Sequence, residues 1–396
     1  MPAPASPRLL ILVLAAITAL GPMSMQIFLP ALPAIQDAFT VSAGRAQLAL
    51  SVPLAAIAFS TLAYGPASDS FGRRPVLAVG LAIFLVGSII CAIAPTIGIL
   101  ILGRIVQAVG GAAGMVLCRA IIRDLYDRET AAKMLAYMVT ALVAAPMVAP
   151  LIGGVLNDVA GWRSIFVFLG IAGLAALALA YPRVPETLTQ PVHDQSLMSM
   201  LRSFLSLLRV PAFLAYAGQL SFGLGMFMAF IGAAPFVVVR VLGRPPTELG
   251  VLLLIITGGF MVGTFVTARI AGRVGVDRMI LFGSGLSVTF GILMVALVLA
   301  GEWTVWAIFL PGAGMAFANG LIMPNAQAAA VSINPRIAGA ASGLMGFLQM
   351  STGALFAQLA GVLQDGTPIP MVIVVTVASV LGFVSILFLP RQGRSP

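Results

Sequence analysis

The sequence has 396 residues, of which 60% are hydrophobic and 8% charged, against roughly 45–50% and 25% in soluble domains. This composition excludes a soluble globular domain and indicates an integral membrane protein. The formal net charge of +9 comes from basic residues scattered over short turns. Because there is no basic tract with interleaved aromatic residues, we expect no nucleic-acid partner.

Continuous apolar runs, interrupted by charge, proline or glycine, predict twelve membrane-spanning helices. A β-barrel is disfavoured because the runs do not alternate between apolar and polar residues. The predicted spans lie near residues 9–31, 45–65, 76–94, 97–122, 133–156 and 163–182, and then near 211–239, 248–268, 279–300, 303–330, 338–362 and 369–390. The longest polar stretch separates the two sets. We therefore predict an N-terminal half at 1–182, a cytoplasmic linker at 183–209 and a C-terminal half at 210–396.

Basic residues are distributed unevenly between the two sides of the predicted spans. If both termini are inside, sixteen of the 21 lysines and arginines fall in inner turns, four fall in outer turns, and Arg104 falls within a span. Cytoplasmic loops carry an excess of lysine and arginine, so this bias predicts two cytoplasmic termini. The apolar run at the N-terminus continues to Leu32, and we take it as an uncleaved first span.

The few residues suited to catalysis or metal binding are isolated. Cys91 and Cys118 lie in apolar runs without a CxxC pattern, and the single histidine, His193, falls in the polar linker. An embedded enzyme needs a nucleophile with its base, paired carboxylates or a metal-binding cluster at depth. We expect no enzymatic activity, no metal and no bound cofactor.

A charged stretch, Gly65-Pro-Ala-Ser-Asp69-Ser-Phe-Gly72-Arg73-Arg74, lies between the second and third predicted spans. We expect its two glycines to bracket a tight turn and its arginines to mark the cytoplasmic membrane edge. From the residues alone, a purely topological role, as an anchor at the membrane edge, stays an alternative. Its G-x-x-x-D-x-x-G-R-R spacing resembles the loop signature of the major facilitator superfamily. This resemblance implies an all-α fold of two six-helix pseudo-symmetric halves, with the substrate path between them.

A degenerate copy of this stretch, Arg269-Ile-Ala-Gly272-Arg273-Val-Gly275-Val-Asp277-Arg278, follows the eighth predicted span. In it, Gly272 replaces Asp69 and Gly275 corresponds to Gly72. Two basic glycine turns, each after the second span of its half, indicate a repeat of six spans.

The fourth predicted span carries Arg104 and Gln107 on one helical face. They resemble the R-x-x-Q-G signature of the superfamily, with Ala108 where glycine is usual. An arginine at this depth is costly and faces a cavity or a partner, unless it snorkels to the outer headgroups. At the inner end of the span lie Arg123 and Asp124. The resemblance implies that Asp124 joins Asp69 and Arg73 in a charge relay at the cytoplasmic gate; without it, Asp124 reads equally as part of a solvated turn.

The fifth predicted span contains Pro146, Pro150, Gly153 and Gly154. Prolines four residues apart bend a helix, and small residues allow a neighbouring helix to approach closely. The stretch Ala149-Pro150-Leu-Ile-Gly153-Gly154 resembles the G-P-x-x-G-G signature of exporters in this superfamily, although alanine precedes each proline. Helix packing alone is the alternative interpretation.

Further fragments resemble the Bcr/CflA branch of drug-efflux transporters in this superfamily. They are Leu29-Pro30-Ala-Leu-Pro33, Arg119-Ala-Ile-Ile-Arg123-Asp124-Leu, Gly161-Trp162-Arg163-Ser-Ile-Phe166, Pro185-Glu186-Thr187 and Ala234-Pro235-Phe236. The resemblance implies a monomer in a bacterial inner membrane that exports drug-like compounds, such as phenicols or bicyclomycin, in exchange for protons. An importer, or an uncoupled facilitator of a small metabolite, is the alternative.

One departure from this branch concerns the coupling proton. Gln26 stands where these proteins commonly have an aspartate in the first span, and no acidic residue lies in the middle of any predicted span. Since Arg104 is the only deep charge, we expect neutral or anionic amphiphiles to be favoured over cations. The predicted cavity residues are amides and soft apolar side chains: Gln26, Phe28, Gln107, Gln219, Phe222, Met226, Phe230, Asn319, Asn325 and Gln349.

Overall fold

The computed structural model describes residues 7–188, 197–333 and 337–389. His193 of the predicted linker and the basic residues Arg336, Arg391 and Arg394 lie outside the described residues. The described chain is built from helices, as expected for segments in hydrocarbon, where each backbone N–H and C=O must find a partner within its own segment.

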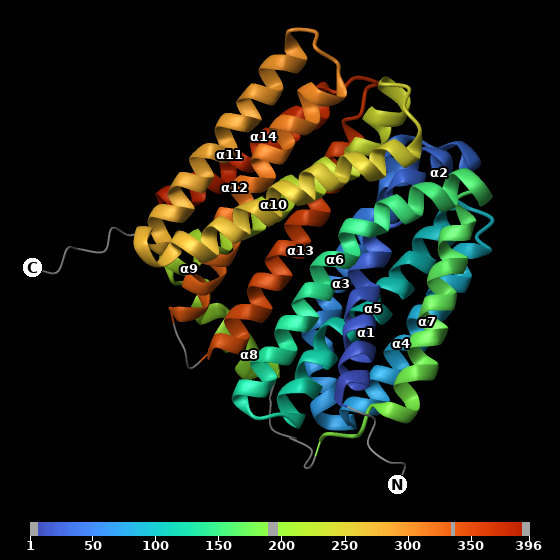
Figure 1. Ribbon diagram of the computed structural model, residues 1–396, viewed down its shortest axis with the longest axis vertical. Coiled ribbons are helices and arrows are strands. Elements are labelled where there is room, and N and C mark those ends of the chain that lie inside the picture. Colours follow the sequence, from blue (N-terminus) through green and yellow to red (C-terminus); the bar gives the residue numbers. More distant parts are fainter. Residues whose placement is uncertain (1–6, 189–196, 334–336, 390–396) are drawn as a thin grey trace, which may run out of the picture. The chain divides into compact units, whose positions relative to one another are not determined.

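Unit 1 consists of residues 1–195 with 244–251. Its helices are α1 (Pro7–Gln26), the 3₁₀ turn η1 (Leu29–Ala31), α2 (Leu32–Phe39), α3 (Ala43–Phe71), α4 (Arg73–Ala92), α5 (Ile97–Leu125), α6 (Arg128–Ala160) and α7 (Arg163–Arg183). Helix α5 packs against α1, α3 and α4, and α7 packs against α4 (Figure 1). The first predicted span is interrupted after Gln26, because Pro30 and Pro33 lack the N–H group that a continuous helix needs.

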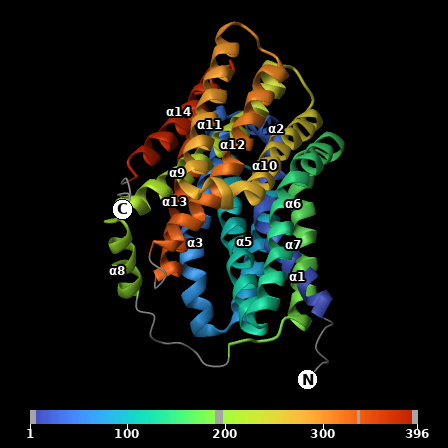
Figure 2. The ribbon, with the colours of Figure 1, turned by 60° about the vertical axis from the view of Figure 1, so that its left-hand side comes forward.

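Unit 2 consists of residues 196–243 with 252–396. Its helices are α8 (Leu197–Leu207), α9 (Pro211–Phe236) with the π-helical turn η2 (Val237–Val241), α10 (Pro246–Val274), α11 (Val276–Leu299), α12 (Val305–Ser332), α13 (Ala338–Val362) and α14 (Ile369–Leu387). Helix α9 contacts α12, α13 and α14, and α11 contacts α12 and α14 (Figure 2). Residues 246–251, the first turns of α10, are grouped with unit 1.

The two units repeat the same packing. The pairs α4–α5, α4–α7 and α1–α6 in unit 1 recur as α11–α12, α11–α14 and α9–α13 in unit 2. Gly72 precedes α4 with φ +97° and ψ 148°, and Gly275 precedes α11 with φ +91° and ψ 147°. The predicted repeat of six helices is therefore confirmed. The residue boundaries proposed for the halves and the linker stay predictions.

Among the described residues, ten helices are long and apolar enough to cross a membrane. Helices α6 and α13 occupy the positions of the fifth and eleventh predicted spans, and the described part of α6 contains a shorter apolar helix at Met147–Ala160. These helices account for all twelve predicted spans. Helix α8 lies inside the stretch that we predicted as a linker.

Candidate functional site

The turn of the loop signature is made by one glycine. Helix α3 continues through Asp69 to Phe71, and Ser68 Oγ donates a hydrogen bond to Gly65 O within it. The prediction that Gly65 and Gly72 bracket a tight turn was therefore wrong for Gly65, which is helical. The polar end of α3 extends the helix beyond the apolar run, so hydropathy alone does not mark its end. Only Gly72 has the positive φ that favours glycine.

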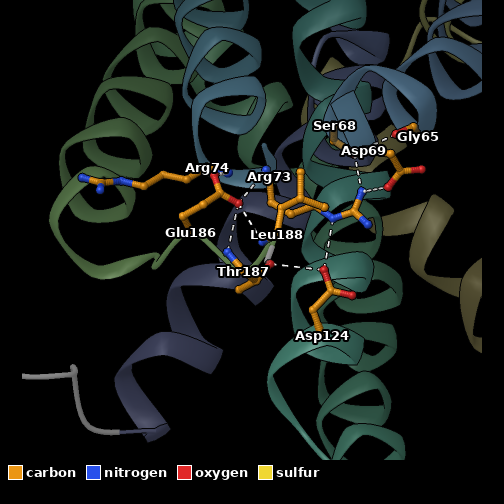
Figure 3. Close-up of polar contacts among 9 residues, drawn as sticks. All are labelled: Gly65, Ser68, Asp69, Arg73, Arg74, Asp124, Glu186, Thr187 and Leu188. Atoms are coloured by element: carbon orange, nitrogen blue, oxygen red, sulfur yellow. Dashed lines mark hydrogen bonds and ion pairs between the residues drawn. The ribbon is translucent and has the colours of Figure 1, made fainter. Parts of the chain in front are cut away.

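A charged cluster surrounds the side chain of Arg73 at this end of unit 1 (Figure 3). Its Nη1 lies 2.5 Å from Asp69 Oδ1 and donates to Ser68 Oγ at 2.5 Å, and its Nε lies 3.1 Å from Asp124 Oδ2. The structure thus brings together the three residues that we expected to form a charge relay. Arg123, which precedes Asp124 at the inner end of the same helix, is exposed on α5.

Glu186, which follows α7, also contacts this cluster, although it was not among the predicted gate residues. Its Oε1 accepts hydrogen bonds from the backbone N–H groups of Arg73, Thr187 and Leu188, each at 2.9 Å. Its Oε2 accepts from the N–H of Arg74 at 3.2 Å. The first N–H groups of a helix have no intrahelical partner, so this carboxylate caps α4. In the sequence, Pro185-Glu186-Thr187 supported the family resemblance, but nothing there indicated a contact between Glu186 and α4.

Two further contacts fix the chain after α7 to the same cluster. Thr187 Oγ1 donates to Asp124 Oδ2 at 3.2 Å. The Arg74 guanidinium donates to Tyr181 O at 2.8 Å and lies 4.9 Å from the centre of the Tyr181 ring. The charged cluster therefore draws residues from α3, α4, α5, the last turn of α7 and the segment after α7.

Arg104 is fully buried in unit 1. Its Nη1 donates to Ser24 O at 2.9 Å and to Gln107 Oε1 at 2.5 Å, and its Nε donates to Ala49 O at 3.2 Å. The guanidinium carbon lies 4.1 Å from the centre of the Phe28 ring, a cation–π contact. Arg104 therefore links α1, α3 and α5, and it does not snorkel to a headgroup region. No carboxylate among the described residues forms an ion pair with it.

Gln107 is also fully buried, and its Nε2 donates to Ser88 Oγ of α4 at 2.8 Å. Gly87 of α4 packs directly on the Gln107 backbone, where there is no room for a Cβ atom. Phe28 and Gln107, predicted to line a substrate cavity, are thus in contact with Arg104 in the interior of unit 1.

The predicted exporter stretch lies where α6 meets two other segments of unit 1. A Cβ atom at Gly153 would overlap with Ile27 O, which follows α1. At Gly154, a Cβ atom would lie 3.0 Å from Thr247 Cα, in the first turn of α10. Pro150 is buried in α6. Pro146 also lies on α6, but its side chain is outside the described residues.

Most of the predicted cavity residues in unit 2 are buried and make polar or aromatic contacts. Asn319 Nδ2 donates to Gly223 O at 3.2 Å, Asn325 Nδ2 donates to Leu321 O at 2.7 Å, and Met226 Sδ accepts from Ser287 Oγ at 3.6 Å. The ring of Phe222 packs on Phe356, and the ring of Phe230 packs on Phe309. Gln219 is buried against Gly382, while Gln26 and Gln349 are half-buried. A substrate-binding role for these residues stays a prediction.

Comparison with known proteins places this architecture in a family. The sequence pattern described as "Major Facilitator Superfamily" matches residues 14–358. The chain is 28% identical to the Bicyclomycin resistance protein homolog of Haemophilus influenzae, covering 97% of this chain and 96% of that protein. It is 29% identical to Multidrug resistance protein D of Escherichia coli (90% and 89%) and 32% identical to the Chloramphenicol resistance protein of Pseudomonas aeruginosa (72% and 67%).

Solved structures show the same fold at low sequence identity. A bacterial homologue of the human lysosomal transporter Spinster superposes with a TM-score of 0.75 at 16% identity, covering 97% of this chain and 95% of that one. A D-xylose–proton symporter gives a TM-score of 0.75 at 15% identity, covering 98% of both chains. The family model covers most of the chain, and the predicted signature residues lie on helices of a repeated six-helix unit. This chain is therefore a multi-pass membrane transporter, not an enzyme, and belongs to the major facilitator superfamily.

Proposed function

We propose that this transporter exports drug-like small molecules from a bacterial cytoplasm by alternating access, coupled to proton entry. The observation that supports this most is its similarity, over 97% of its length, to a bicyclomycin resistance homologue, together with the similarity to chloramphenicol and multidrug resistance proteins. On this proposal the protein is an inner-membrane monomer with both termini in the cytoplasm, and its charged cluster is the cytoplasmic gate.

The charges inside the bundle support neutral or anionic substrates. Arg104 is buried without an acidic partner among the described residues, so the interior of unit 1 carries an uncompensated positive charge. In a medium of low dielectric constant such a charge repels a cation over a longer range than it does in water. A neutral phenicol-like compound is therefore a better candidate substrate than a cationic dye.

The test is transport by purified protein in proteoliposomes under an imposed pH gradient. We expect the gradient to drive uptake of a neutral phenicol-like compound, and a cationic dye to be transported more slowly. Asp124→Asn should uncouple transport from the gradient, because the amide carries no charge to pair with Arg73. Arg119→Lys, on the exposed face of the same helix, is the control.

An uncoupled facilitator is the second candidate, and it is favoured by Gln26 and by the lack of an acid in the middle of any predicted span. It predicts that the compound equilibrates across the liposome membrane whatever the pH gradient. Direction is tested in cells: deletion of the transporter raises the intracellular level of an exported compound and lowers that of an imported one.

A further inference from the structure

We infer that Glu186 is a positioning residue of the gate: it holds the first turn of α4 so that the Arg73 side chain reaches both Asp69 and Asp124. The loop signature does not include Glu186, which lies 112 residues after Arg74. This inference rests on the transport function proposed above, and it adds a residue that acts on the charged cluster from the start of the chain between the two halves.

Glu186 binds the N-terminus of α4 through both oxygens of its carboxylate. The free N–H groups of Arg73 and Arg74 point to different oxygens of one carboxylate, Oε1 at 2.9 Å and Oε2 at 3.2 Å (Figure 3). Hydrogen bonds from a helix N-terminus to an ionised group are among the stronger ones in proteins, and the helix dipole favours a negative charge there. This pair of bonds fixes the backbone from which the Arg73 side chain leaves.

Gly72 leaves room for this carboxylate. A Cβ atom at Gly72 would lie 2.6 Å from Glu186 Oε2 and 3.1 Å from Glu186 Cδ. Its φ of +97° is also one that other residues rarely adopt. The glycine of the signature therefore makes the turn and also admits Glu186 to the helix end.

The contacts around Arg73 close into a ring. Thr187 Oγ1 donates to Asp124 Oδ2 at 3.2 Å, and the same oxygen accepts from Arg73 Nε at 3.1 Å. The ring thus runs from the Arg73 backbone through Glu186, Thr187 and Asp124 to the Arg73 side chain. Both the backbone and the guanidinium of Arg73 are held, so the position of its charge is set on two sides.

The repeat in unit 2 shows that the turn itself does not need such an acid. Gly275 has the same conformation as Gly72, yet a Cβ atom at Gly275 would meet no atom within 4 Å. The acid in the first turn of α11 is its own Asp277, which accepts from Tyr216 Oη at 2.6 Å. Residues 388–396, which follow α14 as Glu186 follows α7, contain no aspartate or glutamate. Among the described residues, the long-range acidic cap is therefore found at α4 and not at α11.

Transport in proteoliposomes provides the first test. We expect Glu186→Ala to lower the maximal transport rate of the phenicol-like compound about tenfold with an unchanged half-saturation concentration, since a lost charged cap corresponds to roughly one factor of ten. Glu186→Gln should fall between Glu186→Ala and the unmodified protein, because its amide oxygen still accepts one of the two N–H groups. Glu302→Ala, in an exposed turn, is the matched control. Unchanged rates in Glu186→Ala would overturn the inference.

A second readout does not depend on transport. Spin labels are attached at Tyr137→Cys and Phe388→Cys, both exposed, after Cys91 and Cys118 are replaced by alanine, and the distribution of distances between the labels is measured. We expect Glu186→Ala and Asp124→Asn to shift this distribution in the same direction, and the double variant to shift it no further, because each breaks the same ring.

These two readouts separate the inference from the proposed function. If the unmodified protein transports none of the compounds, the proposed function fails, while the label distances still test Glu186. If Glu186→Ala does not fold, Glu186→Gln is used, since its uncharged amide keeps only one of the two bonds to α4. A smaller shift in the same direction is expected from Glu186→Gln, and a distribution identical to that of the unmodified protein would overturn the inference.

Discussion

Gly72 and Gly275 have the same backbone conformation but different surroundings, and this separates two reasons for a glycine at such a turn. Both positions have φ near +90°, in a region that is costly for any other residue, by about 1–3 kcal/mol. Only at Gly72 does a carboxylate occupy the space of a side chain. Backbone strain therefore applies to both glycines, and a steric conflict applies to one.

We predict that Gly72→Ala lowers the melting temperature of the detergent-solubilised protein more than Gly275→Ala does. The excess comes from displacing Glu186 from the α4 N-terminus. Gly65→Ala is the control: this glycine is helical, and an added Cβ would meet no atom within 4 Å, so its melting temperature should stay the same or rise. An equal fall in melting temperature for Gly72→Ala and Gly275→Ala would mean that Glu186 does not cap α4 in the solubilised protein.

The surroundings of Arg104 match the geometry of an arginine side chain better than that of a lysine. Its planar guanidinium meets two carbonyl groups and one amide oxygen from three helices, which a lysine ammonium on a flexible stem does not match. We predict that Arg104→Lys destabilises the protein by about 2 kcal/mol, because buried acceptors lose their donors. Arg119→Lys, exposed on the same helix, should leave the melting temperature unchanged. An equal melting temperature for both variants would contradict the prediction.

At the scale of elements, the sequence predicted the helices well because hydropathy reports which segments lie in hydrocarbon. It located helix ends less well. Helix α3 continues to Phe71 past the apolar run, and α8 forms inside a polar stretch. Average hydropathy indicates neither the extension of α3 nor the formation of α8, because both lie in polar stretches.

The candidate site was predictable only where its residues are close in sequence or belong to a family signature. Asp69, Arg73 and Asp124 were found in this way. Glu186 was not, because its role depends on the end of α7 lying beside the start of α4, and an acid in a polar linker has no periodicity to indicate such a contact. A carboxylate just after the last span of a half is the signal to look for in related chains.

The α6 contacts lead to a graded prediction. Gly153→Ala should impair transport severely, because the added Cβ overlaps with Ile27 O and forces α6 away from α1. Gly154→Ala should have a smaller effect, since the nearest atom, Thr247 Cα, is 3.0 Å from the added Cβ. Gly258→Ala in α10, with no atom within 4 Å, is the control. Initial transport rates of the three variants, compared at equal amounts of folded protein, test this order.

For the whole molecule, the distribution of charge bears on the substrates that we propose. By sequence, all twelve acidic residues fall near the ends of predicted spans or in turns, and Arg104 is the deep charge of the described residues. The fold itself does not specify a substrate, since one architecture supports transport of many compounds. The buried cation and Gln26 are the features of this chain that bear on substrate charge.

We predict that Gln26→Asp extends transport to cationic compounds, because a carboxylate in the first span offsets the charge of Arg104 and can also carry a proton. The measurement is growth of cells expressing each variant in a series of neutral and cationic drugs. Gln26→Glu should give the same extension, whereas Gln26→Asn, which is uncharged, should not. An unchanged resistance profile for Gln26→Asp would contradict this view of substrate selection.

The two arginine sites also differ in their access to the surrounding solution. The carboxylates that pair with Arg73 are 19% and 23% exposed, whereas Arg104 has no exposed surface. At 0.1 M ionic strength, dissolved ions screen exposed charges that lie more than about 10 Å apart, and they act far less on buried charges. Because the ion pairs of Arg73 span only 2.5 and 3.1 Å, we expect salt to weaken them slightly, through their exposed carboxylates, and to leave the buried contacts of Arg104 unchanged.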